Sequence, residues 1–118
     1  MQADLGAVRY LRAIATQCRN TRQYYTTDAQ QQFQCVTSYY LNVASTDVAA
    51  DGDFTAVCGT DSCPQLFTGN ALMDTEEPVA RNEFDWPIAA RFVRLNPQSW
   101  LVKIALRWEL YGCDNLST

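Results

Sequence analysis

Residues 84–113 read FDWPIAARFVRLNPQSWLVKIALRWELYGC, and this stretch decides the fold class. Near its end, apolar residues alternate with polar or small ones. The apolar members are Ile104, Leu106, Trp108 and Leu110. A period of two residues is typical of a β-strand with one buried and one solvated face. The stretch therefore predicts a sheet rather than a helical protein.

Five further segments are predicted as short strands, because β-branched, aromatic and other apolar residues cluster there between turn signals. They are residues 8–15, 36–43, 54–58, 64–68 and 90–95. Asp51, Gly52 and Asp53 form a turn signal in the middle of the chain. Since no segment shows a helical period with capping residues, the sequence predicts an all-β sandwich or barrel.

Prolines and tryptophans in the quoted stretch give two more expectations. Pro87 and Pro97 cannot donate to a strand ladder, so we expect them at strand ends. Trp100 and Trp108 are large apolar side chains, and we expect both to anchor the core.

The composition limits the function. The chain has 118 residues, enough for one domain, and a net charge of -4, which argues against binding duplex nucleic acid. It contains no histidine, which excludes histidine-based catalysis and imidazole zinc sites. The remaining catalytic candidates are neighbouring acids such as Glu76 and Glu77, which are typical of a solvated surface, so no enzyme is expected.

Five cysteines in so short a chain favour disulfides and an oxidising, extracellular setting. Buried, reduced thiols are the alternative. The odd number leaves one cysteine without an internal partner. The first residues lack the basic and apolar regions of a secretory signal.

Five sequence blocks, in the family's order, resemble the discoidin domain, also called the coagulation factor 5/8 type C domain. They are ADLG at 3–6, ATQ at 15–17, VTSY at 36–39, FTGN at 67–70 and the stretch 84–113 with its ARFVR, PQSW and IALRWELYGC segments. The resemblance implies an antiparallel, galactose-binding-like jelly-roll β-sandwich over residues 1–113, followed by a tail at 114–118. It also implies a secreted, non-enzymatic adhesion module.

Compared with the family pattern, the chain lacks an opening segment whose cysteine would pair with the closing one. Cys113 is therefore expected to be free or intermolecular. Cys18 and Cys35 flank one long excursion between neighbouring strands, and we expect them to pair. Cys58 and Cys63 flank a tight turn and form the second expected pair.

In this family, loops at one end of the sandwich bind cell-surface ligands. Here they correspond to residues 19–34 and the segment 71–78. The candidate ligand-binding residues are Arg19, Asn20, Arg22, Tyr24, Tyr25, Asn70, Leu72 and Met73. Guanidinium groups suit anionic or hydroxylated ligands, and tyrosine rings suit sugar faces or membrane interfaces. In the alternative interpretation, the aromatic residues pack the loop itself and the arginines are merely solvated.

The ligand is expected to be a cell-surface glycan or glycoprotein. The first loop has no aliphatic residue except Ala29, and acidic residues follow Leu72 and Met73, which disfavours anionic lipid. Phosphatidylserine binding remains an alternative. So does an assembly protein that dimerises through Cys113 and an exposed strand edge.

Two further alternatives concern charged residues. A calcium site among Asp47, Asp51 and Asp53 is conceivable, but their spacing matches no EF-hand loop, so no cofactor is expected. Arginines within the predicted strands either bind ligand or form ion pairs with Asp4, Glu83 or Glu109. These arginines are Arg91, Arg94 and Arg107.

Overall fold

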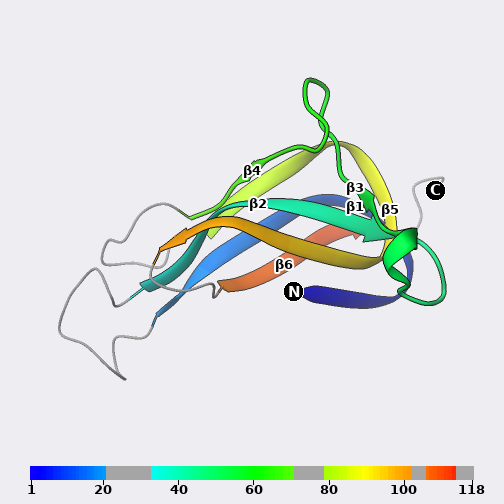
Figure 1. The fold of residues 1–118 in the computed structure, drawn as a ribbon, viewed down its shortest axis with the longest axis horizontal. Helices are drawn as coiled ribbons and strands as arrows, with labels where there is room; N and C mark the ends of the chain where they lie inside the picture. The colour runs from blue at the N-terminus through cyan, green and yellow to red at the C-terminus, as the bar shows by residue number, and fades with distance from the viewer. Residues whose placement is uncertain (21–32, 71–78, 102–105, 114–118) are drawn as a thin grey trace.

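The computed structural model describes residues 1–20, 33–70, 79–101 and 106–113. Its elements are β1 (Gln2–Asn20), β2 (Phe33–Ala44), the 3-10 turn η2 (Asp51–Asp53), β3 (Thr55–Ala56), β4 (Phe67–Thr68), β5 (Val79–Leu101) and β6 (Leu106–Cys113). Every strand pair is antiparallel. The strand order is β3-β2-β5-β1-β6, and β4 also pairs with β2 (Figure 1). The predicted all-β, antiparallel fold is confirmed.

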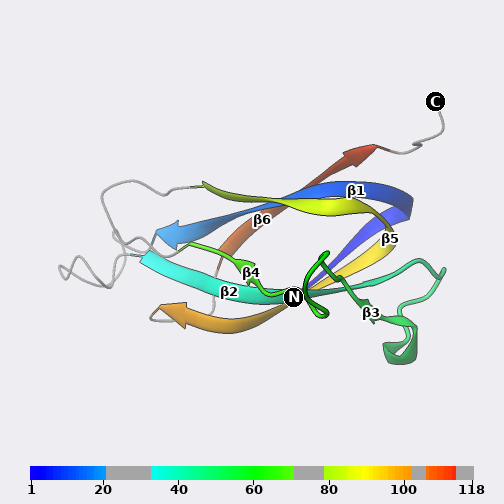
Figure 2. The same cartoon turned by 90° about the horizontal axis from the view of Figure 1, so that it is seen from above.

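Strand β5 is bent, and its bend turns the sheet into a two-layer sandwich. The first half of β5 pairs with β1, from Val79 to Ala90, and the second half pairs with β2, from Phe92 to Leu101. In Figure 2, β6, β1 and the first part of β5 form one layer, while β2, β4 and the rest of β5 form the other. A long strand that changes partner along its length joins the two layers at one end.

Strand β1 turns at the same corner as β5. Its first residues pair with β5 beyond the bend, and its register shifts between Asp4 and Arg9. Gly6 lies in this irregular stretch with a φ of 81°, a left-handed conformation that glycine adopts without steric cost. The amide of Gly6 donates to Asp4 Oδ1 at 2.8 Å, which fixes the turn locally.

The core lies between the two layers. Tyr39 and Phe67 are almost fully buried, and their rings stack with centroids 5.5 Å apart. Phe84 meets the ring of Phe67 edge-on at 5.8 Å. Asn82 Nδ2 donates to the Tyr39 hydroxyl at 3.2 Å, so the buried phenol has a partner. Burial raises the pKa of Tyr39 to about 12, although this hydrogen bond opposes the shift.

The prolines do not end strands, contrary to the sequence expectation. Pro87 and Pro97 both lie inside β5. Pro87 falls between the pairs Leu11↔Ile88 and Ala13↔Glu83, where β5 has extra residues without partners in β1, and Pro97 adjoins a second register shift. A bulge removes the need for a ladder donor, so a proline is tolerated there without ending the strand.

The two tryptophans also differ from expectation. Trp108 is partly buried and packs against the core, as predicted. Trp100 is 47% exposed and is therefore not a core residue. It is the penultimate residue of β5, where the strand reaches the end of the sandwich. No helix in the described ranges is long and apolar enough to cross a membrane.

Candidate functional site

One end of the sandwich gathers the ends of four strands, as the left side of Figure 1 shows. The residue pairs at this end are Gln17↔Val79, Cys18↔Leu106, Asn20↔Phe33 and Cys35↔Leu101. The described chain therefore stops at this end after Asn20 and Leu101 and resumes at this end with Phe33, Val79 and Leu106. We call this part of the molecule the connection end.

A disulfide ties the two layers together at the connection end. Cys18 in β1 is bonded to Cys35 in β2, with Cα atoms 4.5 Å apart, and both side chains are fully buried. Across a sequence separation of 17 residues, such a crosslink stabilises a fold by about 3 kcal/mol on the chain-entropy model. The disulfide also fixes the distance between the two strand ends that flank residues 21–32. The Cys18–Cys35 pairing is one of the two predicted from the sequence.

The second predicted pairing is also present. Cys58 and Cys63 are bonded, with Cα atoms 4.5 Å apart, across the turn that they flank. The side chain of Cys113 lies outside the described part of the chain, so its free or intermolecular state stays a prediction.

Gly69 and Asn70 fix where the segment 71–78 begins. Their amides donate to the carbonyls of Thr37 and Val36 at 2.8 and 2.9 Å. Gly69 lies so close to the Val36 carbonyl oxygen that a Cβ atom has no room. Asn70 Oδ1 accepts a hydrogen bond of 3.0 Å from Thr16 Oγ1. Asn70 is only 2% exposed, so its side chain is held inside the fold at the start of the second predicted loop, and its ligand-binding role stays a prediction.

The other predicted ligand-binding residues lie at or beyond the connection end. Arg19 and Asn20 are the last residues of β1 and pair with Gln34 and Phe33 of β2, but their side chains are not described. The remaining candidates fall outside the described residues; they are Arg22, Tyr24, Tyr25, Leu72 and Met73. The structure thus brings together the starting points of both predicted loops.

Sequence reasoning missed a row of hydroxyl groups beside Trp100. Ser99 Oγ lies 2.5 Å from Thr37 Oγ1 and 2.5 Å from Ser38 Oγ. Trp100 follows Ser99 directly and pairs with Val36, so the exposed indole and the hydroxyls both lie near the end of β5. An aromatic ring together with hydroxyl donors and acceptors at one end of a sandwich suits a ligand with sugar-like hydroxyls. The signal was present in the PQSW segment, but its proline was assigned to a strand end and its tryptophan to the core.

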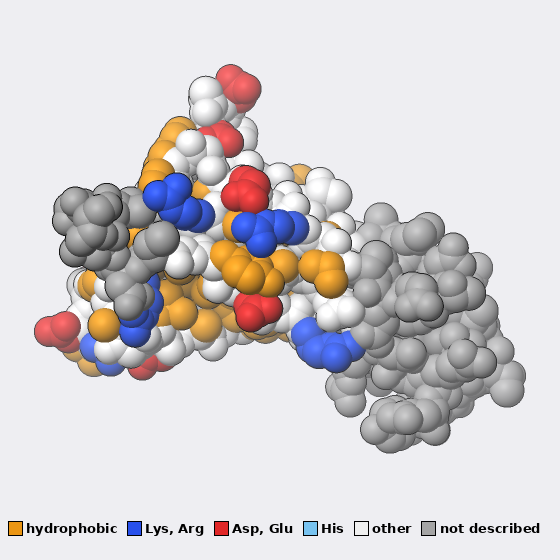
Figure 3. Space-filling model, turned by 180° about the vertical axis from the view of Figure 1, so that it is seen from behind, with side chains coloured by type: hydrophobic (Ala, Val, Ile, Leu, Met, Phe, Trp, Pro, Cys, Tyr) orange, Lys and Arg blue, Asp and Glu red, His pale blue; other side chains and the backbone are white. Residues whose placement is uncertain are grey.

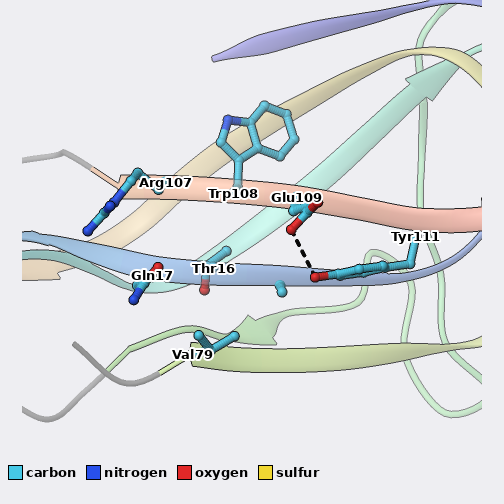
Figure 4. Close-up of a pocket in the computed structure, with 8 residues that line it drawn as sticks. Thr16, Gln17, Val79, Arg107, Trp108, Glu109 and Tyr111 are labelled. Atoms are coloured by element: carbon cyan, nitrogen blue, oxygen red, sulfur yellow. Dashed lines mark hydrogen bonds between the residues drawn. The ribbon is translucent and has the colours of Figure 1, made fainter. Parts of the chain in front are cut away.

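A groove of about 390 Å³ opens on the outer face of the β6–β1–β5 layer, next to the connection end. Its lining includes Ala15, Gln17, Val79, Arg107, Glu109 and Tyr111 (Figure 4). The Tyr111 hydroxyl donates to Glu109 Oε2 at 2.9 Å, and this hydrogen bond raises the pKa of the Tyr111 phenol.

Two of the strand arginines form ion pairs away from the connection end. Arg91 Nε lies 3.1 Å from Asp4 Oδ1, a pair expected from the sequence. The hydrogen bond from Arg91, followed by that from the Gly6 amide, lowers the pKa of Asp4. Arg94 pairs with Asp51 at 2.9 Å, a partner not among the predicted ones. Arg107 instead lines the groove.

The structure does not support the alternative of a calcium site among Asp47, Asp51 and Asp53. Asp51 is engaged by Arg94. Within the described ranges, no group of three histidine, cysteine, aspartate or glutamate residues is arranged to hold a metal ion.

The chain is similar to segments of several animal proteins. It is 35% identical over 115 residues to neurexin-4 of Drosophila melanogaster and 31% identical over 113 residues to neuropilin-1 of Homo sapiens. These matches cover 97% and 96% of this chain but only 8% and 11% of the relatives, so the chain spans about a tenth of their length. No protein-family model matches the chain.

The fold is also similar to that of a solved structure of a longer chain. The recombinant discoidin II of Dictyostelium discoideum superposes with a TM-score of 0.68 at 27% sequence identity. The superposition covers 95% of this chain and 36% of that one.

Proposed function

The chain belongs to the discoidin domain family, and on that premise we propose that it recognises a cell-surface glycan or glycoprotein through its connection end. It acts as a non-enzymatic, extracellular binding module. The observation that supports this most directly is the meeting of four strand ends around the buried Cys18–Cys35 disulfide. Binding residues are commonly carried on loops that a rigid scaffold positions.

The crosslinked scaffold favours recognition energetically. Each loop that must be ordered on binding reduces the affinity, and fixing the ends of a loop beforehand lowers that cost. Here the ends of the segment 21–32 are fixed by Cys18 and Cys35, and the segment 71–78 is fixed at its start by Asn70. The two disulfides also agree with an extracellular setting.

The chemistry at the connection end favours hydroxylated ligands over anionic lipid. Arg22, Tyr24 and Tyr25 belong to the first segment, and the hydroxyl row beside Trp100 adds donors and acceptors. The second segment contains three carboxylates, and the whole chain carries a net charge of -4. Both features repel phosphatidylserine surfaces. We further propose that the binding domain extends over residues 1–113, with 114–118 as a tail.

A glycan array run beside a phosphatidylserine liposome sedimentation assay tests this function on the full chain. We expect glycan signal without liposome binding, and we expect Arg22→Ala/Tyr24→Ala to reduce the glycan signal at least about tenfold, the equivalent of one or two lost hydrogen bonds. The matched control is Tyr10→Ala/Arg12→Ala, which removes the same residue types from exposed positions in the middle of β1. Liposome binding without glycan signal would contradict the proposal, as would full signal from the first variant.

A further inference from the structure

The groove on the outer face of the β6–β1–β5 layer borders the connection end through Gln17 and Val79, but none of its lining residues belongs to the two predicted loops. Its floor is Ala15 of β1, which is 6% exposed. Arg107, Glu109 and Tyr111 of β6 form one wall, and Val79 of β5 borders the other side (Figure 4). A volume of about 390 Å³ lies within the range of about 300–1,000 Å³ that is typical of small-molecule sites.

Contacts within the wall of the groove and with neighbouring side chains hold it in place. The Arg81 guanidinium lies 4.5 Å from the centroid of the Tyr111 ring, and Arg81 Nε is 2.8 Å from Glu83 Oε1. The Tyr111 hydroxyl in turn donates to Glu109 Oε2 at 2.9 Å. Tyr111 is thus fixed at both its ring and its hydroxyl, which reduces the cost of ordering it around a ligand.

The charges around the groove balance. Among the described side chains that line it, Arg107 is basic and Glu109 is acidic. Arg81, next to the groove, is neutralised by Glu83. In Figure 3, acidic, basic and apolar side chains alternate over the middle of this face. Neither sign of charge dominates around the groove, so the groove favours neither an anionic nor a cationic ligand.

The remaining chemistry suits an uncharged ligand rich in hydroxyl groups. The Glu109 carboxylate accepts hydrogen bonds, the Tyr111 hydroxyl oxygen can accept a further one, and Ala15 and Val79 offer apolar surface. A sugar ring presents the same mixture of hydroxyls and C–H faces. The lining of the groove thus offers both polar groups and apolar surface, as small-molecule sites do.

We propose that this groove binds a neutral saccharide and forms a second glycan contact beside the connection end. The inference rests on the proposed function, because it assumes that the ligand is a glycan. Glu109 and Tyr111 receive the hydroxyl groups of the sugar, and the small side chain of Ala15 leaves room for its ring. The groove thus contacts, along the outer face of the sheet, a glycan that is also held at the connection end.

Titration of the ¹⁵N-labelled full chain with lactose, maltose and cellobiose, followed by NMR, tests the site. We expect the largest amide shifts at Ala15, Val79 and Glu109 with at least one of these sugars. Glu109→Gln is expected to weaken that binding about tenfold, since it replaces a charged acceptor by a neutral one. Tyr111→Phe keeps the ring and is expected to cause a similar loss.

The control Asp53→Asn changes an exposed carboxylate in the turn η2 and should leave the affinity unchanged. Absence of shifts at the groove amides with all three sugars up to tens of millimolar overturns the inference, as does unchanged affinity in both groove variants. If Arg22→Ala/Tyr24→Ala abolishes the array signal while the groove stays silent, only this inference fails. If the groove responds and that double variant has no effect, the loop-based function fails instead.

Discussion

Removing the Cys18–Cys35 disulfide is expected to destabilise the fold more than any other single crosslink change. The double variant Cys18→Ala/Cys35→Ala frees the unfolded chain from a loop closed over 17 residues. On the chain-entropy model this costs about 3 kcal/mol. Both cysteines are fully buried, so loss of their sulfur atoms adds a packing cost to this value.

The expected change in Tm follows from the size of the chain. The entropy of unfolding is about 2.1 cal/mol/K per residue near the midpoint, so for this chain each kcal/mol corresponds to about 4 °C and the double variant loses about 12 °C. The matched control, Cys58→Ala/Cys63→Ala, opens a separation of only 5 residues. It is expected to lose about 2 kcal/mol, or about 8 °C.

Differential scanning calorimetry and urea unfolding of both double variants measure these values. Urea gives the free energy of unfolding, and calorimetry gives Tm. A loss below about 1 kcal/mol for Cys18→Ala/Cys35→Ala, or a loss smaller than that of the control pair, would refute the reasoning, because it would mean that the connection end does not depend on this crosslink.

Three further outcomes are expected. Gly69→Ala should lose about 1–3 kcal/mol in urea unfolding, because its Cβ collides with the Val36 carbonyl; an unchanged midpoint would contradict the contact. Arg91 lowers the pKa of Asp4, so the stability that Asp4 adds is present above its unfolded pKa of 3.8 and is lost as pH falls through the lower folded value. Asp4→Asn should therefore flatten the acid limb of a curve of urea midpoint against pH, and an equally steep limb would refute this. The pKa of Tyr39 is about 12 in the folded chain against 10.0 in the unfolded chain, so the free energy of unfolding falls as pH rises between these values. Tyr39→Phe should lose less free energy of unfolding over that interval, and a loss equal to that of the unmodified chain would count against burial of the phenol.

The alternating pattern of the C-terminal stretch was enough to predict a sheet, because alternation of apolar and polar residues with a period of two is typical of β-strands. It was not enough to predict where strands bend. β5 runs from Val79 to Leu101, although only residues 90–95 were expected as a strand there. Its prolines lie at register shifts, and a bulge depends on the neighbouring strand, which a single segment does not reveal.

The disulfide that anchors the candidate site could be predicted from the sequence, but the contacts around it could not. Cys18 and Cys35 flank one excursion, so their pairing followed from local sequence. Asn70 was chosen because the FTGN block resembles the start of a family binding loop; its hydrogen bond to Thr16, which is 54 residues away, depends on the fold. The groove likewise combines residues of β1, β5 and β6, so no single motif contains it.

Amide hydrogen exchange with and without a glycan identified on the array tests the central claim most directly. The account predicts increased protection in peptides that contain Cys18, Phe33, Val79 and the residues between the described ranges, with no change around η2 (Asp51–Asp53) and β3 (Thr55–Ala56) at the opposite end. Protection confined to η2 and β3 would show that the ligand binds the wrong end of the sandwich and would contradict the account.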